Sequence, residues 1–499
     1  MSYFFIFLGI FLLLAFLRVP IPFSMGISAI LIYLAHGGTS VAISMGAFRA
    51  LNVFTFLAIP AFIFAGDLMA ASGISAAVMR FANSIIGRLR GAVGAVTIVT
   101  CMLFGAITGS SLATITGIGG MMLPEMEKAG YSREYSTGLI SACGFLGILI
   151  PPSIPGILYA MMAGENLMKV WLCTVTPGIM LGLAYIGINY WVYGRKEQKA
   201  KVTQGAFKVG PYFKNIGVQT SKSITALLMP IIIFYGIYGG IFTPTEAGAV
   251  AVAYGLLIGW VVNPIFLKKK PDVKLSKLLS DGALSSASIA MLNTFATIAG
   301  IMITQTRIPA ILTEAMFSLT HSKTIFLLIL NIMLIIVGMF METNSSILLL
   351  GPILIPIATS FGVDPIHFAG IMLLNLEIGM ITPPFAANLF VGCRVGNLTM
   401  DKVLPHMIPF LIACVIVLLI TTYVPAVATF LPNLVSYFAI RFCSGRSEGQ
   451  RTSYNDILDC KRKKNKVLQF NVKKIIICLE KTNHSFLENG FVSVFLMQK

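Results

Sequence analysis

Small polar side chains interrupt two long hydrophobic runs in this sequence. Gly109-Ser110-Ser111 divides the run 92–125, and Thr343-Asn344-Ser345 divides the run 325–358. Hydroxyl, amide and carbonyl oxygens are hard ligands, and at a helix break they suit a sodium ion because inward carbonyl dipoles replace a charged cage. The same side chains also cap broken helices or bond to their own helix. The pattern therefore predicts either ion sites or helix caps.

Proline divides the two hydrophobic runs that follow. Pro151-Pro152 lies within 136–164, and Pro383-Pro384 lies within 366–398. Because proline removes a backbone donor, each spanning helix should break at mid-depth and expose unpaired backbone groups. We predict a sodium site where each polar tip meets a break. The first site is assigned to Ser110, Ser111, Thr114, Gly144, Gly147 and Pro151, and the second to Glu342, Thr343, Asn344, Gly379, Thr382 and Pro383. The substrate is expected to contact Ser110, Ser111, Asn344 and Ser345.

The two blocks match each other at a constant offset of 232 residues. Glycine and proline are common in membrane helices, but five matches at one offset indicate an internal repeat. The matched positions are Pro124, Gly130, Gly147, Pro151 and Pro152 in the first block, and Pro356, Gly362, Gly379, Pro383 and Pro384 in the second.

Two carboxylates fall within these hydrophobic runs. A carboxylate inside a membrane is costly and is a functional candidate by default. Glu342 adjoins the second tip, where it either bears on a cation or pairs with a neighbour. Glu377 is the weaker candidate because Phe145 occupies its matching position. Asp67 and Glu246 are interpreted as interfacial or helix-pairing acids. His367 is interpreted as a surface residue.

The composition places the chain in a membrane. Of 499 residues, 57% are hydrophobic and 11% are charged, and the mean hydropathy is +0.87, whereas a soluble domain has about 25% charged residues. The net charge of +17 lies mostly in short segments between hydrophobic runs, so it indicates membrane topology and no nucleic-acid partner. No nucleotide-binding or metalloprotease motif occurs. We expect no enzyme activity and no cofactor other than sodium as coupling ion.

The hydrophobic runs predict spans at 2–17, 20–36, 53–72, 170–193, 221–241, 243–264, 278–303 and near 404–430, beside the two blocks. Amphipathic segments are expected at 73–90 and around Arg307 and Glu314. In each block we expect a re-entrant hairpin followed by a broken span. The basic segments 195–222 and 268–277 should be cytoplasmic, and counting from them places Arg88, Arg90, Arg394 and Lys402 inside as well.

Five crossings separate the two hairpins in this count. An odd number inverts the second block relative to the first, as in many secondary transporters. The predicted fold class is therefore an all-α polytopic membrane protein, with an inverted repeat of two re-entrant hairpins and two broken transmembrane helices.

Four separated motifs resemble one family. GAITGSSLATITGIGGMMLPEMEKAGY (105–131), GILIPPSIP (147–155), GGIFTPTEAGAV (239–250) and the segment METNSS to ANLF (341–390) are similar to the large permease subunit of TRAP transporters, the tripartite ATP-independent periplasmic carriers of bacteria. The METNSS and GVDPIHF motifs are most similar to those of the C4-dicarboxylate-type branch of this family. The resemblance covers about residues 1–435.

The resemblance implies an elevator-type transporter in the bacterial inner membrane. It implies sodium symport of small organic anions such as C4-dicarboxylates, sialic acid, or sugar and keto acids. It also implies two protein partners: a small membrane subunit of four helices and a periplasmic solute-binding protein. Because the motifs begin almost at Met1, we expect the small subunit to be a separate chain.

The expected domains follow from the resemblance. They are 1–90 and 166–320 as scaffold helices, 91–165 and 321–400 as the two halves of the transport domain, 401–440 as the last transmembrane helix, and 441–499 as an atypical tail. The tail holds 12 Lys and Arg against 5 acids, and relatives lack it. We interpret it as a disordered extension or a misread frame, with a further short crossing near 434–442 as the alternative.

Two other functions fit parts of the pattern. One is a sodium/anion symporter of the wider ion-transporter group that works without a binding protein. The other is a membrane-embedded enzyme that uses Glu342 and His367 as acid and base.

Overall fold

The computed structural model describes residues 2–87, 91–194, 209–266, 271 and 273–444, and its regular elements in these ranges are helices. The chain divides into two compact units, 1–431 and 432–499. Several predictions lie outside the described residues: the placement of Arg88 and Arg90, the basic segments 195–208 and 267–270, and the tail from residue 445.

Among the described helices, seven are long and apolar enough to cross a membrane. The number is eight if the bent pair Arg133–Leu149 and Ile154–Ala163 counts as one span. The fold class predicted from the sequence is confirmed as a helical, polytopic membrane protein. The opposite orientation of its two hairpins stays a prediction for labelling experiments.

One group of helices lies outside the motif blocks. α1 (Ser2–Phe16) packs on α2 (Ile21–Ala35), and α2 packs on α15 (Leu275–Gln305). α15 also contacts α3 (Ser40–Leu51) and α4 (Ala58–Ala71), which follows the short helix η1 (Phe54–Leu57). α4 lies along α13 (Pro244–Leu256), which continues into η4 (Leu257–Val262) and α14 (Asn263–Phe266). α12 (Val209–Tyr238) packs on α5 (Ile74–Ile86).

Three boundaries differ from the sequence prediction. α3 was not expected, because its twelve residues are too few for a span; Thr39 caps its first turn by accepting from the Ala42 N–H. α12 begins at Val209 rather than near 221, since a helix can carry lysines beyond its apolar part. The last span ends at Tyr423 rather than 430, because Val424 leaves the helical region before Pro425, which starts α22 (Pro425–Ser444).

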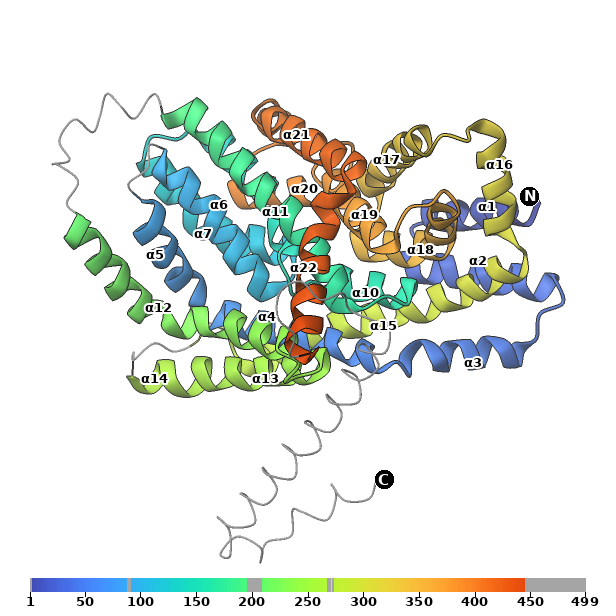
Figure 1. The fold of residues 1–499 in the computed structure, drawn as a ribbon, viewed down its shortest axis with the longest axis horizontal. Helices are drawn as coiled ribbons and strands as arrows, with labels where there is room; N and C mark the ends of the chain where they lie inside the picture. Colours follow the sequence, from blue (N-terminus) through green and yellow to red (C-terminus); the bar gives the residue numbers. More distant parts are fainter. Residues whose placement is uncertain (1, 88–90, 195–208, 267–270, 272, 445–499) are drawn as a thin grey trace, which may run out of the picture. The chain divides into compact units, whose positions relative to one another are not determined.

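The first motif block is a helical hairpin followed by a broken helix. α6 (Ala92–Thr108) and α7 (Ser111–Lys128) lie side by side and are joined by two residues (Figure 1). α8 (Arg133–Cys143) and the single turn α9 (Leu146–Leu149) run up to the proline pair, and α10 (Ile154–Ala163) continues beyond it at an angle of 45°. Both predicted features, the interrupted run and the break at Pro151-Pro152, are therefore present.

The second block repeats this arrangement. Its hairpin consists of α17 (Lys323–Phe340) and α18 (Thr343–Ser360), and its broken helix consists of α19 (Pro365–Gly379) and α20 (Ala387–Gly396). α18 begins 232 residues after α7, and Gly130 and Gly362, at the same offset, both have positive φ angles, of 87° and 70°. Only glycine adopts this conformation without strain, which explains why the sequence repeats it.

The repeat is longer than the sequence indicated. At nearly the same offset, α5 corresponds to α16 (Ile308–Leu319), and α11 (Leu167–Asn189), which ends in η2 (Tyr190–Gly194), corresponds to α21 (Met400–Tyr423). Pro177 in α11 and Pro409 in α21 also stand 232 residues apart. For α5 and α16 the helix boundaries make the correspondence visible.

The two repeats interlock. α20 of the second repeat packs on α7 and α8 of the first, and α10 of the first packs on α18 and α19 of the second. Gly138 on α8 lies against Met407 of α21, while its counterpart Gly370 on α19 lies against Cys173 of α11. α11 and α21 therefore lie with the motif helices. The predicted division into moving and static domains stays a prediction.

Candidate functional site

The tip of the first hairpin is a tight turn stabilised by its own hydroxyl groups. Gly109 has a φ angle of +62°, and Ser110 caps α7 by accepting from the Ala113 N–H at 3.4 Å. The Thr114 hydroxyl donates to the Ser110 carbonyl at 2.8 Å, and its oxygen is 3.4 Å from the Thr108 hydroxyl oxygen. The capping interpretation is thus true of Ser110. It does not exclude ion binding, because hydroxyl oxygens keep lone pairs.

This tip lies against the first broken helix. A Cβ atom on Gly109 would be 3.0 Å from the Pro152 carbonyl oxygen, and one on Gly144 would be 3.2 Å from the Ser111 carbonyl oxygen. Gly147 meets Gly105 backbone to backbone along the hairpin. The structure therefore brings together the residues predicted for the first site, with Pro151 in the break itself.

Two side chains of α11 bind backbone carbonyl groups on the two sides of this break, and the sequence did not indicate them. The Thr174 hydroxyl donates to the Leu149 carbonyl at 2.8 Å, and the Trp171 Nε1–H donates to the Ser153 carbonyl at 3.1 Å. Both side chains are buried. A Thr and a Trp at this spacing on an apolar helix carry no signal of their own, because the partner lies on another segment.

The tip of the second hairpin uses an acid and an amide. Glu342 is the N-cap of α18, and its carbonyl accepts from the Ser346 hydroxyl at 3.0 Å. The Asn344 Nδ2 donates to Glu342 Oε1 at 3.0 Å, whereas the buried Asn344 Oδ1 has no hydrogen-bond partner in the described part of the chain. Ser345 is buried in the first turn of α18. This tip therefore presents unpaired oxygen at the predicted second site.

Glu377 reaches the same tip from α19. Its side chain is 0% exposed, and its Oε1 accepts a hydrogen bond of 2.7 Å from the Thr343 hydroxyl, while Oε2 has no partner among the described residues. The sequence analysis ranked Glu342 above Glu377, yet the Glu342 side chain is exposed and the Glu377 side chain is enclosed. Phe145, the counterpart in the first repeat, is equally buried.

The remaining predicted residues of the second site lie at the break that ends α19. The Thr382 hydroxyl donates to the Ile378 carbonyl at 2.7 Å, and the Thr382 N–H donates to the Gly379 carbonyl at 2.9 Å. Gly379 packs directly on Gly338 of α17, as Gly147 does on Gly105. Pro383 follows in the turn. Thr382 therefore caps its own helix in addition to lying beside the predicted site.

The other ionisable candidates have structural surroundings. His367, interpreted as a surface residue, is in fact 1% exposed, and its Nε2 lies 2.8 Å from the Thr421 carbonyl oxygen. Asp364 caps α19 and places His367 in the first turn against α21. Glu246 completes a capping box with Thr243 at the start of α13, which agrees with an interfacial acid. Asp67 is half-buried on α4.

A buried polar cluster joins α17, α19 and α21, and no sequence signal indicated it. The Asn375 Nδ2 donates to Asn331 Oδ1 at 2.9 Å, and the Asn331 Nδ2 donates to the Thr422 hydroxyl at 3.0 Å. All three side chains are buried. Asn and Thr side chains that form hydrogen bonds between helices stabilise helix association in a bilayer.

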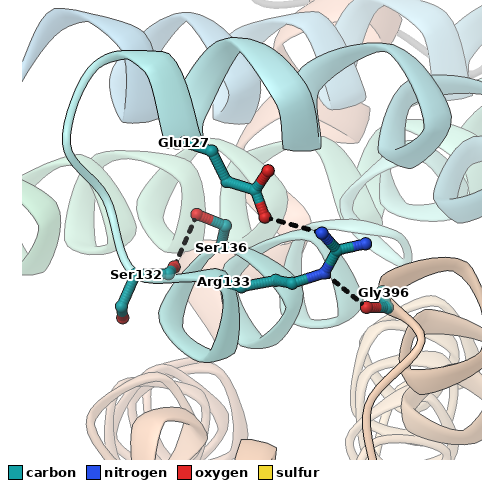
Figure 2. Close-up of polar contacts among 5 residues, drawn as sticks. All are labelled: Glu127, Ser132, Arg133, Ser136 and Gly396. Atoms are coloured by element: carbon teal, nitrogen blue, oxygen red, sulfur yellow. Dashed lines mark hydrogen bonds and ion pairs between the residues drawn. The ribbon is translucent and has the colours of Figure 1, made fainter.

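Arg133 links the repeats at the end of the first hairpin (Figure 2). Its Nη1 lies 2.9 Å from Glu127 Oε1, and its Nε donates to the Gly396 carbonyl at 2.7 Å. Gly396 ends α20, where carbonyl groups lack partners in their own helix. Ser136 donates to the Ser132 carbonyl beside it. The arginine thus caps a helix of the second repeat from the first.

The arrangement offers oxygen ligands but no catalytic constellation. In the described part of the chain, no three His, Cys, Asp or Glu side chains gather as metal ligands. His367 stands ten residues before Glu377 on α19, or about 15 Å along the helix. Glu342 lies at the Glu377 end, so the acid and base of the enzyme hypothesis are far apart.

A family model decides the identity. The model described as tripartite ATP-independent periplasmic transporter, DctM component, matches residues 8–427. The chain belongs to this family. It is therefore a TRAP transporter large permease and not an enzyme, as the resemblance of the motifs predicted. A multi-pass location in the inner membrane agrees with the family and with the apolar helices.

The names of similar TRAP permeases mention different anions. The chain is 37% identical over 423 residues to the isethionate TRAP transporter permease protein DctMQ of Oleidesulfovibrio alaskensis, covering 85% of this chain and 65% of that protein. It is 36% identical to the C4-dicarboxylate TRAP transporter large permease protein DctM of Vibrio cholerae, covering 84% and 94%. It is 30% identical to the sialic acid permease SiaM of Vibrio cholerae, covering 84% and 96%.

The fold has a distant relative among solved structures. The Alcanivorax borkumensis YdaH transporter superposes with a TM-score of 0.52 at 14% identity, covering 79% of this chain and 88% of that chain. At this identity the likeness concerns the fold alone.

Proposed function

We propose that this TRAP permease takes up a small organic anion by sodium symport. The observation that carries the proposal is the meeting of each hairpin tip with a broken helix. At the first meeting point, the Ser111 carbonyl oxygen lies beside Gly144 and Gly109 lies against the Pro152 carbonyl, while the Thr114 hydroxyl bonds to the Ser110 carbonyl within the tip. Neutral oxygens at a helix break are a sodium-binding arrangement.

The donor sets fit sodium by their chemistry. The first tip offers hydroxyl and carbonyl oxygens, and the Ser111 hydroxyl, although buried, makes no hydrogen bond within the described residues. The second tip adds the unpartnered Asn344 Oδ1. Sodium bound by these residues would supply positive charge where an anionic substrate enters. The N-termini of α7 and α18, at the same tips, would add their positive dipole ends.

The class of substrate follows from charge. Isethionate, C4-dicarboxylates and sialic acid, the compounds in the names of the relatives, are all small anions. The proposed substrate is an organic acid of this size, and Ser110, Ser111, Asn344 and Ser345 are the proposed contacts. We further propose that a periplasmic solute-binding protein delivers it and that a small four-helix membrane subunit accompanies the permease.

Uptake into proteoliposomes tests this function. The chain is reconstituted with a candidate periplasmic binding protein and a candidate small subunit, and radiolabelled organic acids are supplied with and without a sodium gradient. Uptake that requires both sodium and the binding protein supports the proposal. Sodium-driven uptake by the permease without a binding protein would favour the alternative of a simple symporter.

Substitutions at the tips test the site itself. Ser110→Ala and Asn344→Ala should weaken apparent sodium affinity, and substrate affinity through it, because linkage is reciprocal. A coupling of about 1–3 kcal/mol corresponds to roughly 5- to 150-fold. Ser44→Ala, on the exposed face of α3, is the control. If both tip variants kept the parent's sodium dependence, the tips would be structural caps only.

A further inference from the structure

The second repeat holds a buried carboxylate where the first repeat has an aromatic ring. Glu377 and Phe145 are separated by the repeat offset, and both are fully buried. No Lys, Arg or His among the described residues forms an ion pair with Glu377. A buried acid without a cationic partner is unfavourable unless hydrogen bonds and nearby charge support it. A buried acid that only one of the two repeats contains therefore needs a functional explanation.

Two other segments converge on this carboxylate, which α19 carries. Thr343 comes from the tip that begins α18 and donates to Glu377 Oε1, while Asn388 comes from the first turn of α20 and lies beside the carboxylate. The Asn388 side chain is also 0% exposed, and neither of its polar atoms has a partner of good hydrogen-bond geometry in the described chain. The N-termini of α18 and α20 both lie at this point, and helix N-termini favour negative charge.

The hydrogen bond determines how the Thr343 hydroxyl is oriented. A hydroxyl has one proton and two lone pairs. Because the proton is directed to Glu377, the lone pairs are directed away from the carboxylate and can face a cation, while Met380 Sδ lies 3.1 Å from the same hydroxyl oxygen. The counterpart Ser111 has no such acceptor, since Phe145 stands in the place of the acid. Only the second tip thus has a hydroxyl that bonds to a buried carboxyl group.

We propose that Glu377 is a positioning residue for sodium in the second repeat, acting through the Thr343 hydroxyl, and that it makes this site tighter for sodium than the site of the first repeat. The inference rests on the proposed sodium coupling. It parallels metal sites in which a carboxylate that does not touch the metal orients a ligand and increases its electron density.

Direct sodium binding tests the role without transport. The full chain, purified in detergent, is titrated with radioactive sodium, and its unfolding temperature is followed against sodium concentration. The parent should show a tight and a weak component. Glu377→Gln should weaken the tight component about 10- to 100-fold, the range for loss of such a partner. Glu314→Gln, an exposed acid on α16, is the matched control and should bind as the parent does.

Variants of Thr343 distinguish a role of Glu377 in orienting the hydroxyl from a role in stabilising the fold alone. Thr343→Ser keeps the hydroxyl and should retain tight binding, whereas Thr343→Val should lose it. The double variant Glu377→Gln with Thr343→Val should bind no more weakly than Thr343→Val alone, because Glu377 acts through that hydroxyl.

Several results would overturn the inference. If Glu377→Gln lowered the unfolding temperature but kept the sodium-dependent shift, the acid would be structural. Additive losses in the double variant would show that Glu377 does not act through Thr343. A parent chain that binds no sodium at all would overturn the proposed function together with this inference, whereas normal binding by Glu377→Gln overturns the inference alone.

Discussion

The contact between Gly105 and Gly147 sets how closely the first hairpin approaches its broken helix. A Cβ atom added at Gly147 would overlap the Cα of Gly105 and lie 3.1 Å from its carbonyl carbon. The obstacle is backbone on a packed helix, so it cannot rotate away as a flexible side chain could. Gly147→Ala should therefore push the two elements apart.

The expected cost follows from two opposing effects. Overpacking a core typically destabilises by about 1–3 kcal/mol, and replacing a helical glycine by alanine recovers up to about 1 kcal/mol. Because the obstacle is main chain, we expect a cost near the upper end of the overpacking range and a net loss of about 1–2 kcal/mol. The tip would also move relative to Pro152, so sodium-dependent uptake should fall.

Thermal unfolding in detergent, together with uptake in proteoliposomes, checks this. Gly120→Ala is the matched control, because Gly120 is also helical, is exposed on α7 and has nothing within 4 Å of an added Cβ. That variant should be unchanged or slightly stabilised. Equal unfolding temperatures and equal uptake for the two variants would refute the close approach of Gly105 and Gly147.

Three further predictions concern topology, the tail and α11. A cysteine replacing Leu89, which lies outside the described residues, should be labelled from the cytoplasm, and one replacing Ser322 from the periplasm; labelling of both from one side would end the inverted-repeat hypothesis. A chain stopped after Phe438 should insert and transport normally, and loss of uptake with normal insertion would contradict this. Thr174→Val leaves the Leu149 carbonyl unpaired and should destabilise by about 1–3 kcal/mol in detergent unfolding; an unchanged unfolding temperature would argue against that bond.

The hairpins and breaks could be predicted because their signals are local. Glycine and proline act on the backbone where they stand, so Gly109 and Pro151 mark a turn and a break without reference to other segments. The repeat added a second, independent copy of each signal. This explains why the block boundaries agree with the structure within a few residues, and why the family could be named from four motifs.

The partners of side chains could not be predicted in the same way. His367 reads as a surface residue at the mouth of a helix, and only the neighbouring α21 buries it. Glu377 was ranked below Glu342 because Phe145 occupies its matching position in the first block, whereas the structure places the Thr343 hydroxyl 2.7 Å from the Glu377 carboxylate. Whether a polar group is capped, paired or open depends on contacts between distant segments, which a single sequence does not display.

The interlocked packing of the repeats has a consequence for biosynthesis. Gly138 contacts Met407, and Arg133 donates to the Gly396 carbonyl. Because more than 250 residues separate the members of each pair, the ribosome must add that length of chain before these contacts can form. Contacts of such high sequence separation form slowly and leave earlier segments exposed. The first block therefore enters the bilayer as an unfinished half, with its polar tip open to lipid. A chain cut short between α11 and α20 would lack these contacts and should therefore not fold as a half-transporter.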